Sequence, residues 1–241
     1  MRRQQRWWGV TVTAGAVLVA VAGCSDSGVG GASAGAGDDK PSAAPTRGAG
    51  GGRQTEKSAL PGLPTASVAR KELAGLKTAA PASMRGYSRA KFPHWAEQGE
   101  RCDTRETVLG RDGTAVKRDA QCRAVSGKWV SVYDGKKATA ASQLDIDHTV
   151  PLANAWRSGA AAWTQEQRKA FANDLAHPQL LAVSASSNRQ KGDQSPDQWA
   201  PPLRSYWCTY ARSWVSVKST YRLTITAAER TKLREMLDTC S

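Results

Sequence analysis

Two short segments, residues 144–151 and 180–193, most constrain what this 241-residue chain can fold into. The first begins Leu-Asp-Ile, typical of the end of a strand, and runs directly into Asp147-His148. The second begins with an apolar run of strand length and continues as a helix from a serine cap to a glycine. The sequence therefore predicts a strand, an insertion, a second strand and a helix, with an acid and a histidine ending the first strand.

The residue types in these two segments indicate phosphodiester chemistry. Asp147 is an acidic metal ligand beside His148, a side chain suited to act as a base near neutral pH. Downstream, Asn188 offers a neutral oxygen ligand, and the cations Arg189 and Lys191 follow it within about one helical turn. These are the parts that a metal-dependent phosphodiesterase needs.

The N-terminus has the pattern of a targeting segment. Three arginines precede residues 7–23, which carry no charge and are mostly apolar, a run too short for a stable membrane anchor. This run ends in Val21-Ala22-Gly23-Cys24, which looks like a lipobox. We therefore expect residues 1–23 to be a lipoprotein-type signal peptide and Cys24 to be lipidated, with an ordinary secretory signal as the alternative. The expected location is outside the cell, lipid-anchored on the extracellular face of the membrane or secreted.

Residues 24–58 are rich in glycine, alanine and serine and hold almost no large apolar side chains. Such a segment cannot bury enough surface to offset its ordering entropy, so we expect a disordered tether. Residues 59–241 have the length of a single domain and contain enough apolar and aromatic residues to form a core.

Four cysteines lie in the expected domain, and an even number in an exported chain indicates disulfides. Three pairings are possible, and we favour the two that are local in sequence, Cys102 with Cys122 and Cys208 with Cys240. A zinc site is the competing interpretation, but the chain has no Cys-x-x-Cys pair and no histidine near these cysteines.

The positive charge is concentrated in the domain. The formal charge of the chain is +13, the signal segment holds three arginines and no acid, and the tether is neutral, which leaves +10 on residues 59–241. A strongly basic exported domain favours polyanions such as nucleic acid, teichoic acid or anionic lipid headgroups. Composition does not choose among them.

Local patterns predict a mixed α+β domain. Residues 127–133 alternate like a half-buried strand, and residues 111–113 read as a turn after a short helix. Helices are expected at residues 165–173, 206–221 and 226–239, the last with a capping box of Thr226 and Glu229. Residues 85–95 interleave basic and aromatic side chains, which suits either nucleic-acid binding or an aromatic satellite of the core.

The combined pattern resembles a known family. It is carried by LDIDHTVPLANAWRSG (144–159), FANDL (171–175), LLAVSASSNRQKGD (180–193) and WAPP (199–202). These segments are similar to the HNH, or ββα-metal, endonuclease superfamily, and to the branch found as the C-terminal domain of GmrSD-type restriction enzymes and as stand-alone secreted proteins. The resemblance implies a ββα-metal core with a helical insertion between the two motif halves and C-terminal helices, stabilised here by two disulfides.

The resemblance also implies roles for individual residues. Asp147 and Asn188 would hold one divalent metal ion, Mg²⁺ rather than Mn²⁺ by preference, and His148 would be the general base. Spacing adds three residues to this set. Arg189 and Lys191 lie one turn or less from Asn188, near enough to contact backbone phosphates, and Asp145 shares a strand face with Asp147, where it would assist the metal or orient a ligand. The implied activity is hydrolysis of phosphodiester bonds in nucleic acid, with DNA favoured.

One position departs from the family pattern. The superfamily usually has an asparagine nine residues before the metal-ligand asparagine, where it pins the loop that carries the histidine. Here that position is Gln179, which keeps the amide on a longer arm. Asn173 is the other candidate for this role, and the sequence does not decide between them.

Two alternatives remain beside the endonuclease interpretation. The basic charge and the Gln179 departure also fit a catalytically degenerate module, tethered to the cell surface, that binds DNA or another polyanion. A hydrolase acting on another phosphodiester, such as teichoic acid, is the third possibility.

Overall fold

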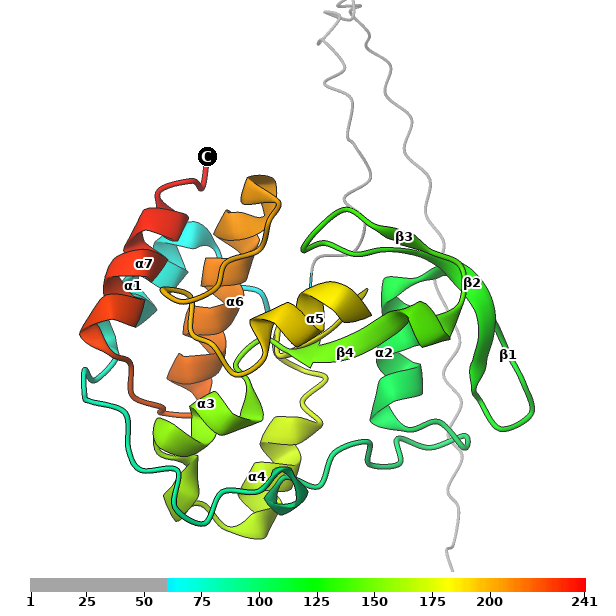
Figure 1. Ribbon diagram of the computed structural model, residues 1–241, viewed down its shortest axis with the longest axis horizontal. Helices are drawn as coiled ribbons and strands as arrows, with labels where there is room; N and C mark the ends of the chain where they lie inside the picture. The colour runs from blue at the N-terminus through cyan, green and yellow to red at the C-terminus, as the bar shows by residue number, and fades with distance from the viewer. Residues whose placement is uncertain (1–59) are drawn as a thin grey trace, which may run out of the picture. The chain divides into compact units, whose positions relative to one another are not determined.

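The computed structural model describes residues 60–241, which fall within one compact unit of the chain. The signal segment, the tether and Cys24 lie outside the described residues. Seven α-helices and five strands are present in the described part (Figure 1). The helices are α1 (Ala66–Gly75), α2 (Thr104–Asp112), α3 (Leu152–Arg157), α4 (Gln165–Ala172), α5 (Ala185–Lys191), α6 (Trp207–Thr220) and α7 (Ala227–Leu237). The strands are β1 (Thr114–Arg118), β2 (Ala124–Val130), β3 (Lys137–Ala138), β4 (Leu144–His148) and β5 (Leu180–Ser184).

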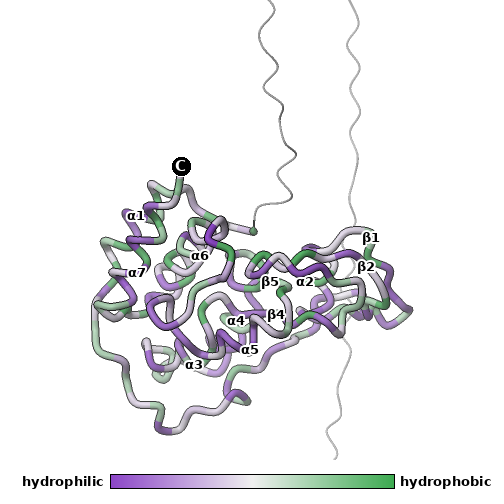
Figure 2. The backbone as a smooth tube through the Cα atoms, turned by 45° about the horizontal axis from the view of Figure 1, so that its top comes forward, coloured by the Kyte–Doolittle hydropathy of each residue, from purple (hydrophilic) through white to green (hydrophobic). Residues whose placement is uncertain are grey.

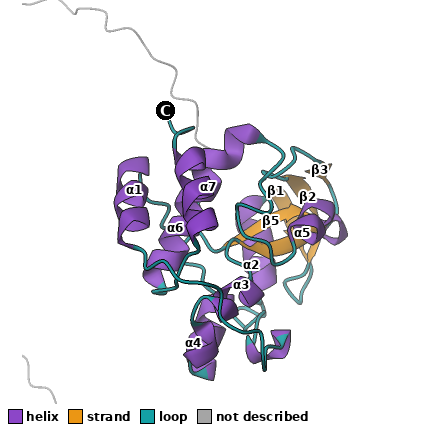
Figure 3. Ribbon diagram, turned by 60° about the vertical axis from the view of Figure 1, so that its left-hand side comes forward, coloured by secondary structure: helices purple, strands orange, loops and turns teal. Residues whose placement is uncertain are grey.

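The strands form two small antiparallel sheets, one in the order β1-β2-β3 and one of β4 with β5. The β4–β5 pair runs in continuous register from Leu144 opposite Ser184 to His148 opposite Leu180. The chain between them forms α3 and α4, and α5 follows β5 directly. Figure 3 shows the strands gathered on one side of the fold, with α1, α6 and α7 on the other. The predicted mixed α+β class is confirmed.

Strand β5 lies between two hydrophobic cores and serves both. Leu181 and Val183 point into the larger core, which is built mainly from helices, while Leu180 and Ala182 point into a smaller core against α2 and β2. All five β5 residues are buried. The apolar run therefore reflects a strand buried on both faces, whereas a strand with one solvent-exposed face would alternate apolar and polar residues. Along α1 and α7 the colour of Figure 2 changes between hydrophilic and hydrophobic, as expected where one face of a helix packs inward.

Helix α2 closes the free edge of β5 with side chains. Arg111 donates from Nη2 to the Leu180 carbonyl (2.5 Å), and the Ala182 amide donates to Asp112 Oδ2 (2.7 Å). These bonds satisfy backbone groups that an edge strand leaves open. They also explain why α2 continues to Asp112, where the sequence predicted a turn.

Strand β2 ends at Val130, three residues earlier than predicted. The Ser131 amide donates to the Lys136 carbonyl (2.8 Å), which closes a turn around Gly135. Within this turn the Tyr133 side chain is fully buried. The turn therefore places an aromatic hydroxyl in the interior at a position where the pattern predicted continuing strand.

Both predicted disulfides are present. Cys102–Cys122 joins the residue before the α2 cap to the β1–β2 connection, and Cys208–Cys240 joins the start of α6 to the end of the chain. The capping box predicted for the last helix is also confirmed, since Thr226 and Glu229 bond each other's backbone amides. Within residues 60–241, no helix combines the length and the apolar character needed to cross a membrane.

Replacing Cys208 and Cys240 together by serine is expected to lower the free energy of unfolding by roughly 3 kcal/mol. The bond closes a loop of 32 residues, and in the chain-entropy model its loss frees the unfolded chain. Urea denaturation of the oxidised chain and of the double variant measures the difference. The Cys102→Ser, Cys122→Ser double variant is the comparison, and it should lower the free energy of unfolding by a similar amount. A loss well under 1 kcal/mol would contradict the assigned role of the bond.

Candidate active site

Helix α5 is held at both ends by side chains and backbone. Asp134 Oδ2 accepts hydrogen bonds from the hydroxyls of Ser184 (2.6 Å) and Ser187 (2.9 Å). Ser184 is also the N-cap of α5, and its Oγ accepts from the Ser187 amide (3.3 Å). The helix ends at Gly192 with φ +54°, a left-handed conformation that favours glycine. Asp134 thereby connects the turn after β2 to the helix that carries Asn188.

Asp147 is buried and both of its carboxylate oxygens are engaged. Tyr133 donates its hydroxyl to Oδ2 (2.6 Å), and Lys191 donates its ammonium group to Oδ1 (2.9 Å). Lys191 also donates to the His148 carbonyl (2.8 Å) and has no exposed surface. Burial raises the pKa of Asp147, while the adjacent ammonium group and the two hydrogen bonds oppose this shift. Burial likewise lowers the pKa of Lys191, against the attraction of the carboxylate.

His148 lies on the opposite face of β4 from Asp147, because successive strand residues alternate. Its Nε2 is 3.0 Å from the Ala172 carbonyl, which can only accept, so Nε2 carries the proton and Nδ1 is left with its lone pair. Trp95 stacks on the imidazole at 5.9 Å between ring centroids. Burial lowers the pKa of His148 to about 3, and nearby positive charges act in the same direction. The ring is therefore neutral near pH 7 and has a free acceptor nitrogen.

Asn188 and Asp145 are joined at the side of the site. Asn188 donates from Nδ2 to Asp145 Oδ2 (3.2 Å), and Arg189 Nε lies 3.8 Å from the same oxygen. Within residues 60–241 the Asn188 Oδ1 atom has no hydrogen-bond partner, so this oxygen is available as a metal ligand. Arg189 is exposed over most of its side chain.

The structure separates the two candidates for the loop-pinning amide. Gln179 is buried, accepts from the Val150 amide (3.1 Å) and donates to the Val150 carbonyl (3.0 Å). It thus fastens the backbone just after His148. Asn173 instead accepts from the Ala96 amide and the Thr104 hydroxyl, both at 2.8 Å, and so fastens the segment before α2 to the end of α4.

A pocket of about 270 Å³ opens at the end of β4. Four of the residues singled out from the sequence line it, namely Asp147, His148, Asn188 and Arg189. The others do not: Gln179 and Asn173 act on the surrounding backbone, Asp145 bonds Asn188 from the side, and Lys191 is buried beneath Asp147. Direct contact of Lys191 with a phosphate, which the sequence predicted, does not fit a side chain without exposed surface.

Several residues around the pocket were not selected from the sequence. Tyr133 falls in the stretch whose alternation predicts a strand, and Asp134 follows that stretch directly. Tyr87 and Arg89 line the pocket from a segment about 60 residues upstream of β4. Their only local signal was the alternation of basic and aromatic residues in that segment, which fits core packing equally well.

The donor set fits a hard divalent cation. Carboxylate and amide oxygens are the protein ligands that Mg²⁺ prefers, usually with waters and substrate phosphate completing its shell. Asp147 and Asn188 supply such oxygens at one pocket, and Asn188 Oδ1 is unengaged in the described part of the chain. In residues 60–241 no cluster of three or more histidine, cysteine or acidic side chains is arranged around a metal site. A metal ion held here would have few protein ligands, and water and substrate would complete its coordination.

Sequence comparison decides the family. A family model described as GmrSD restriction endonucleases, C-terminal domain, matches residues 104–236. The chain belongs to this family. It is also 57% identical over 180 residues to an uncharacterized secreted protein of Arthroderma benhamiae. The aligned residues cover 75% of this chain and 88% of that protein. No solved structure matches the chain.

The match to the GmrSD C-terminal domain family runs from α2 to α7 and includes every residue placed at the pocket from β4 and α5. It links the domain to nucleases and to nucleic-acid substrates. The segment carrying Tyr87 and Arg89 precedes the matched residues.

Asp134→Asn is expected to destabilise the protein in a pH-dependent way. Hydrogen bonds from Ser184, the Lys136 amide and Ser187 lower the pKa of Asp134 from 3.8 to about 2, against the effect of burial. The ionised carboxylate therefore adds stability of about 2 kcal/mol above pH 4, and this is lost as pH falls through 2. Unfolding free energies of both proteins at pH 6 and near pH 2 measure the effect. An equal difference at both pH values would show that the carboxylate charge is not what anchors α5.

Proposed function

We propose that this chain is a metal-dependent endonuclease that hydrolyses phosphodiester bonds in nucleic acid, with DNA as the favoured substrate. The observation that carries the proposal is the convergence of Asp147, His148 and Asn188 on one pocket within a domain of a restriction-endonuclease family. In this proposal β4, β5 and α5 form the ββα-metal core, and α3 and α4 are its insertion.

His148 is the general base in this proposal. Its neutral imidazole has the free nitrogen Nδ1, while the Ala172 carbonyl holds the other nitrogen and Trp95 holds the ring plane. The base takes a proton from a water molecule as the water oxygen attacks phosphorus. The bond to the leaving 3′ oxygen breaks, and that oxygen takes a proton from solvent. The products carry a 5′-phosphate and a 3′-hydroxyl.

Asp147 and Asn188 would hold one divalent ion, Mg²⁺ or Mn²⁺. When bound, such an ion neutralises charge on the phosphate and on the leaving oxygen. Gln179 holds the backbone after His148 and Asp145 orients Asn188, so both act as positioning residues. Arg189 is exposed at the pocket and Arg89 lines it from the upstream segment, so these two are placed to contact the substrate phosphates.

Lys191 has a different role in this proposal from the one the sequence predicted. Its ammonium group compensates the buried Asp147 carboxylate, which would otherwise be an unpaired charge in a low-dielectric environment. An approaching divalent ion meets a ligand already paired with a cation. We therefore expect weak metal binding by the free protein and stronger binding when a phosphate adds negative charge.

The biological setting is also part of the proposal. An N-terminal signal, a lipid on Cys24 and the tether at residues 24–58 would display the domain outside the cell. Two disulfides suit an oxidising environment, and the similar protein of A. benhamiae is described as secreted.

A binding module that does not cut is the second candidate. It is favoured by the Asp147 carboxylate, whose two oxygens are both engaged, and by the +10 charge of the domain. This candidate requires salt-sensitive binding of DNA that needs neither metal nor His148.

His148→Ala is expected to reduce nicking of supercoiled plasmid by about 10²–10⁴-fold, because the attacking water loses its base. The assay uses the oxidised full-length chain with Mg²⁺ or Mn²⁺, and a chelator should abolish the activity. His177→Ala is the matched control, since His177 is partly exposed and bonds Asp174 away from the pocket. DNA binding without cutting under either metal would support the binding module instead.

Lys191→Met is expected to strengthen Mn²⁺ binding in the absence of nucleic acid. Without the ammonium group the Asp147 carboxylate is uncompensated, so the metal-free protein loses stability and added Mn²⁺ raises its melting temperature more than in the wild type. Lys136→Met is the control, because Lys136 is exposed and pairs with Asp134 outside the pocket. Equal Mn²⁺-induced shifts in the wild type and Lys191→Met would contradict the charge-compensation role.

A further inference from the structure

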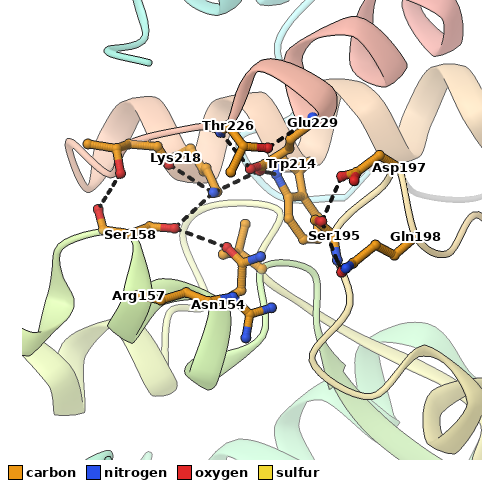
Figure 4. A network of polar contacts seen from close by, with 12 residues as sticks. Asn154, Arg157, Ser158, Ser195, Asp197, Gln198, Trp214, Lys218, Thr226 and Glu229 are labelled. Atoms are coloured by element: carbon orange, nitrogen blue, oxygen red, sulfur yellow. Dashed lines mark hydrogen bonds and ion pairs between the residues drawn. The ribbon is translucent and has the colours of Figure 1, made fainter. Parts of the chain in front are cut away.

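A second cavity of about 370 Å³ lies beside the proposed active site. Its walls come from the end of α3, the segment after α5 and the start of α7, as seen in the close view of Figure 4. Eleven of its thirteen lining residues are polar or charged. The proposed hydrolysis uses none of them.

A buried ion pair forms one wall of this cavity. Lys218 donates to Glu229 Oε1 (2.7 Å), to the Ser158 hydroxyl (3.1 Å) and to the Thr224 carbonyl (2.9 Å), and both charged side chains are almost fully buried. Burying two charges costs several kcal/mol per ion before they attract each other. The polar groups of this wall are therefore part of the buried core, and the hydrogen bonds of Lys218 hold their positions.

Unused hydrogen-bonding groups face the cavity from two sides. Asn154 is only 3% exposed, and its Oδ1 accepts from the Ser158 hydroxyl (3.2 Å). Its Nδ2 has no partner within residues 60–241, and in Figure 4 the amide lies between Ser158 and the segment that carries Ser195 and Gln198. Gln198 Oε1 accepts from Ser195, which leaves its Nε2 likewise without a partner in this part of the chain.

The cavity and the active-site pocket share lining elements. Asp193 lines both, and Arg157 donates to its carboxylate (2.6 Å), which holds it between the two. Helix α3 also serves both, with Leu152 and Ala153 at the active-site pocket and Asn154 at the second cavity. The shared residue and helix place the second cavity next to the pocket that His148 lines.

The charges of the lining disfavour phosphate as the occupant. Of the three carboxylates that line the cavity, Asp193 is paired with Arg157 and Glu229 with Lys218, and Asp197 adds a further negative charge. An anionic group would meet this excess of carboxylates, whereas a neutral ring with donors and acceptors on its edge would not. Asparagine and glutamine amides pair with base edges, and the cavity volume is in the range of small-molecule sites.

We propose that this cavity is a nucleobase subsite, which receives the unpaired base of a nucleotide adjoining the scissile phosphate. The proposal rests on the proposed endonuclease function for its biological meaning, although base binding itself needs neither metal nor His148. Asn154 Nδ2 and Gln198 Nε2 donate to the base edge, and the free oxygen of Asp197 accepts from it. Entry of the base into the cavity requires a single-stranded or locally opened substrate, because a paired and stacked base cannot leave the duplex to reach a cavity.

The first test measures binding of adenosine, guanosine, cytidine, thymidine and free ribose to the full-length chain in a chelator. At least one nucleoside should bind, and ribose should not. Gln198→Glu replaces the donor at an exposed position and should weaken that binding by about tenfold or more. Asn154→Ala should do the same. Gln121→Glu, the same exchange at an exposed site away from both cavities, is the matched control.

The second test reads base preference from the ends produced by cutting a random DNA library. A preferred base at a constant distance from the cut, changed by Gln198→Glu, supports the subsite. Nucleoside binding in a chain that never cuts would support the subsite and refute the endonuclease. Cutting without base preference and without nucleoside binding would overturn the subsite and leave the endonuclease standing. Binding of ribose alone, or equal binding by the Gln198 and Gln121 variants, would also overturn it.

Discussion

The pairing of β4 with β5 is the interaction on which the rest of the structure depends. It brings residues 144–148 and 180–184 into one register, although α3 and α4 separate them in the chain. The alternation along β5 then sends Leu181 and Val183 to the helical core and Leu180 and Ala182 to the core beneath α2. A shift of one residue would exchange these sets and would turn Asp147 away from Lys191. Register therefore determines both the packing and the site.

The charges at the site are nearly balanced, because its few acidic side chains are paired with cations or amides. One carboxylate, Asp147, is held by an ammonium group and a phenol, both of them buried. A second acidic residue, Asp145, is paired with Asn188 and lies near Arg189. This arrangement leaves little net negative charge at the pocket. It suits a site where substrate phosphate, rather than the protein, supplies most of the negative charge around a cation.

The two cavities divide the polar groups of the domain according to their chemistry. The pocket at β4 has arginines at Arg89 and Arg189, which suit phosphates, while the neighbouring cavity has carboxylates and amides, which suit a neutral base. Asp193 and α3 belong to both, so a change at the Arg157–Asp193 contact acts on the two together. In the proposed function, a phosphate at the first pocket and a base in the second cavity would each meet groups of matching chemistry.

Local features follow from neighbouring residues of the chain. The Ser184 cap, the Thr226–Glu229 capping box and the two local disulfides depend on residues close in the chain. The motif predicts that Asp147, His148 and Asn188 belong to one site, and the β4–β5 pairing brings them to one pocket. The fold alone shows that Lys191 lies beneath Asp147, that Tyr133 reaches the same carboxylate, and that Gln179 rather than Asn173 bonds the backbone after His148. These outcomes rest on burial and on contacts between distant segments. Local periodicity carries no information about them. The same pattern fits an exposed or a buried Lys191, a strand that continues through Tyr133 or ends before it, and either Gln179 or Asn173 beside the His148 loop.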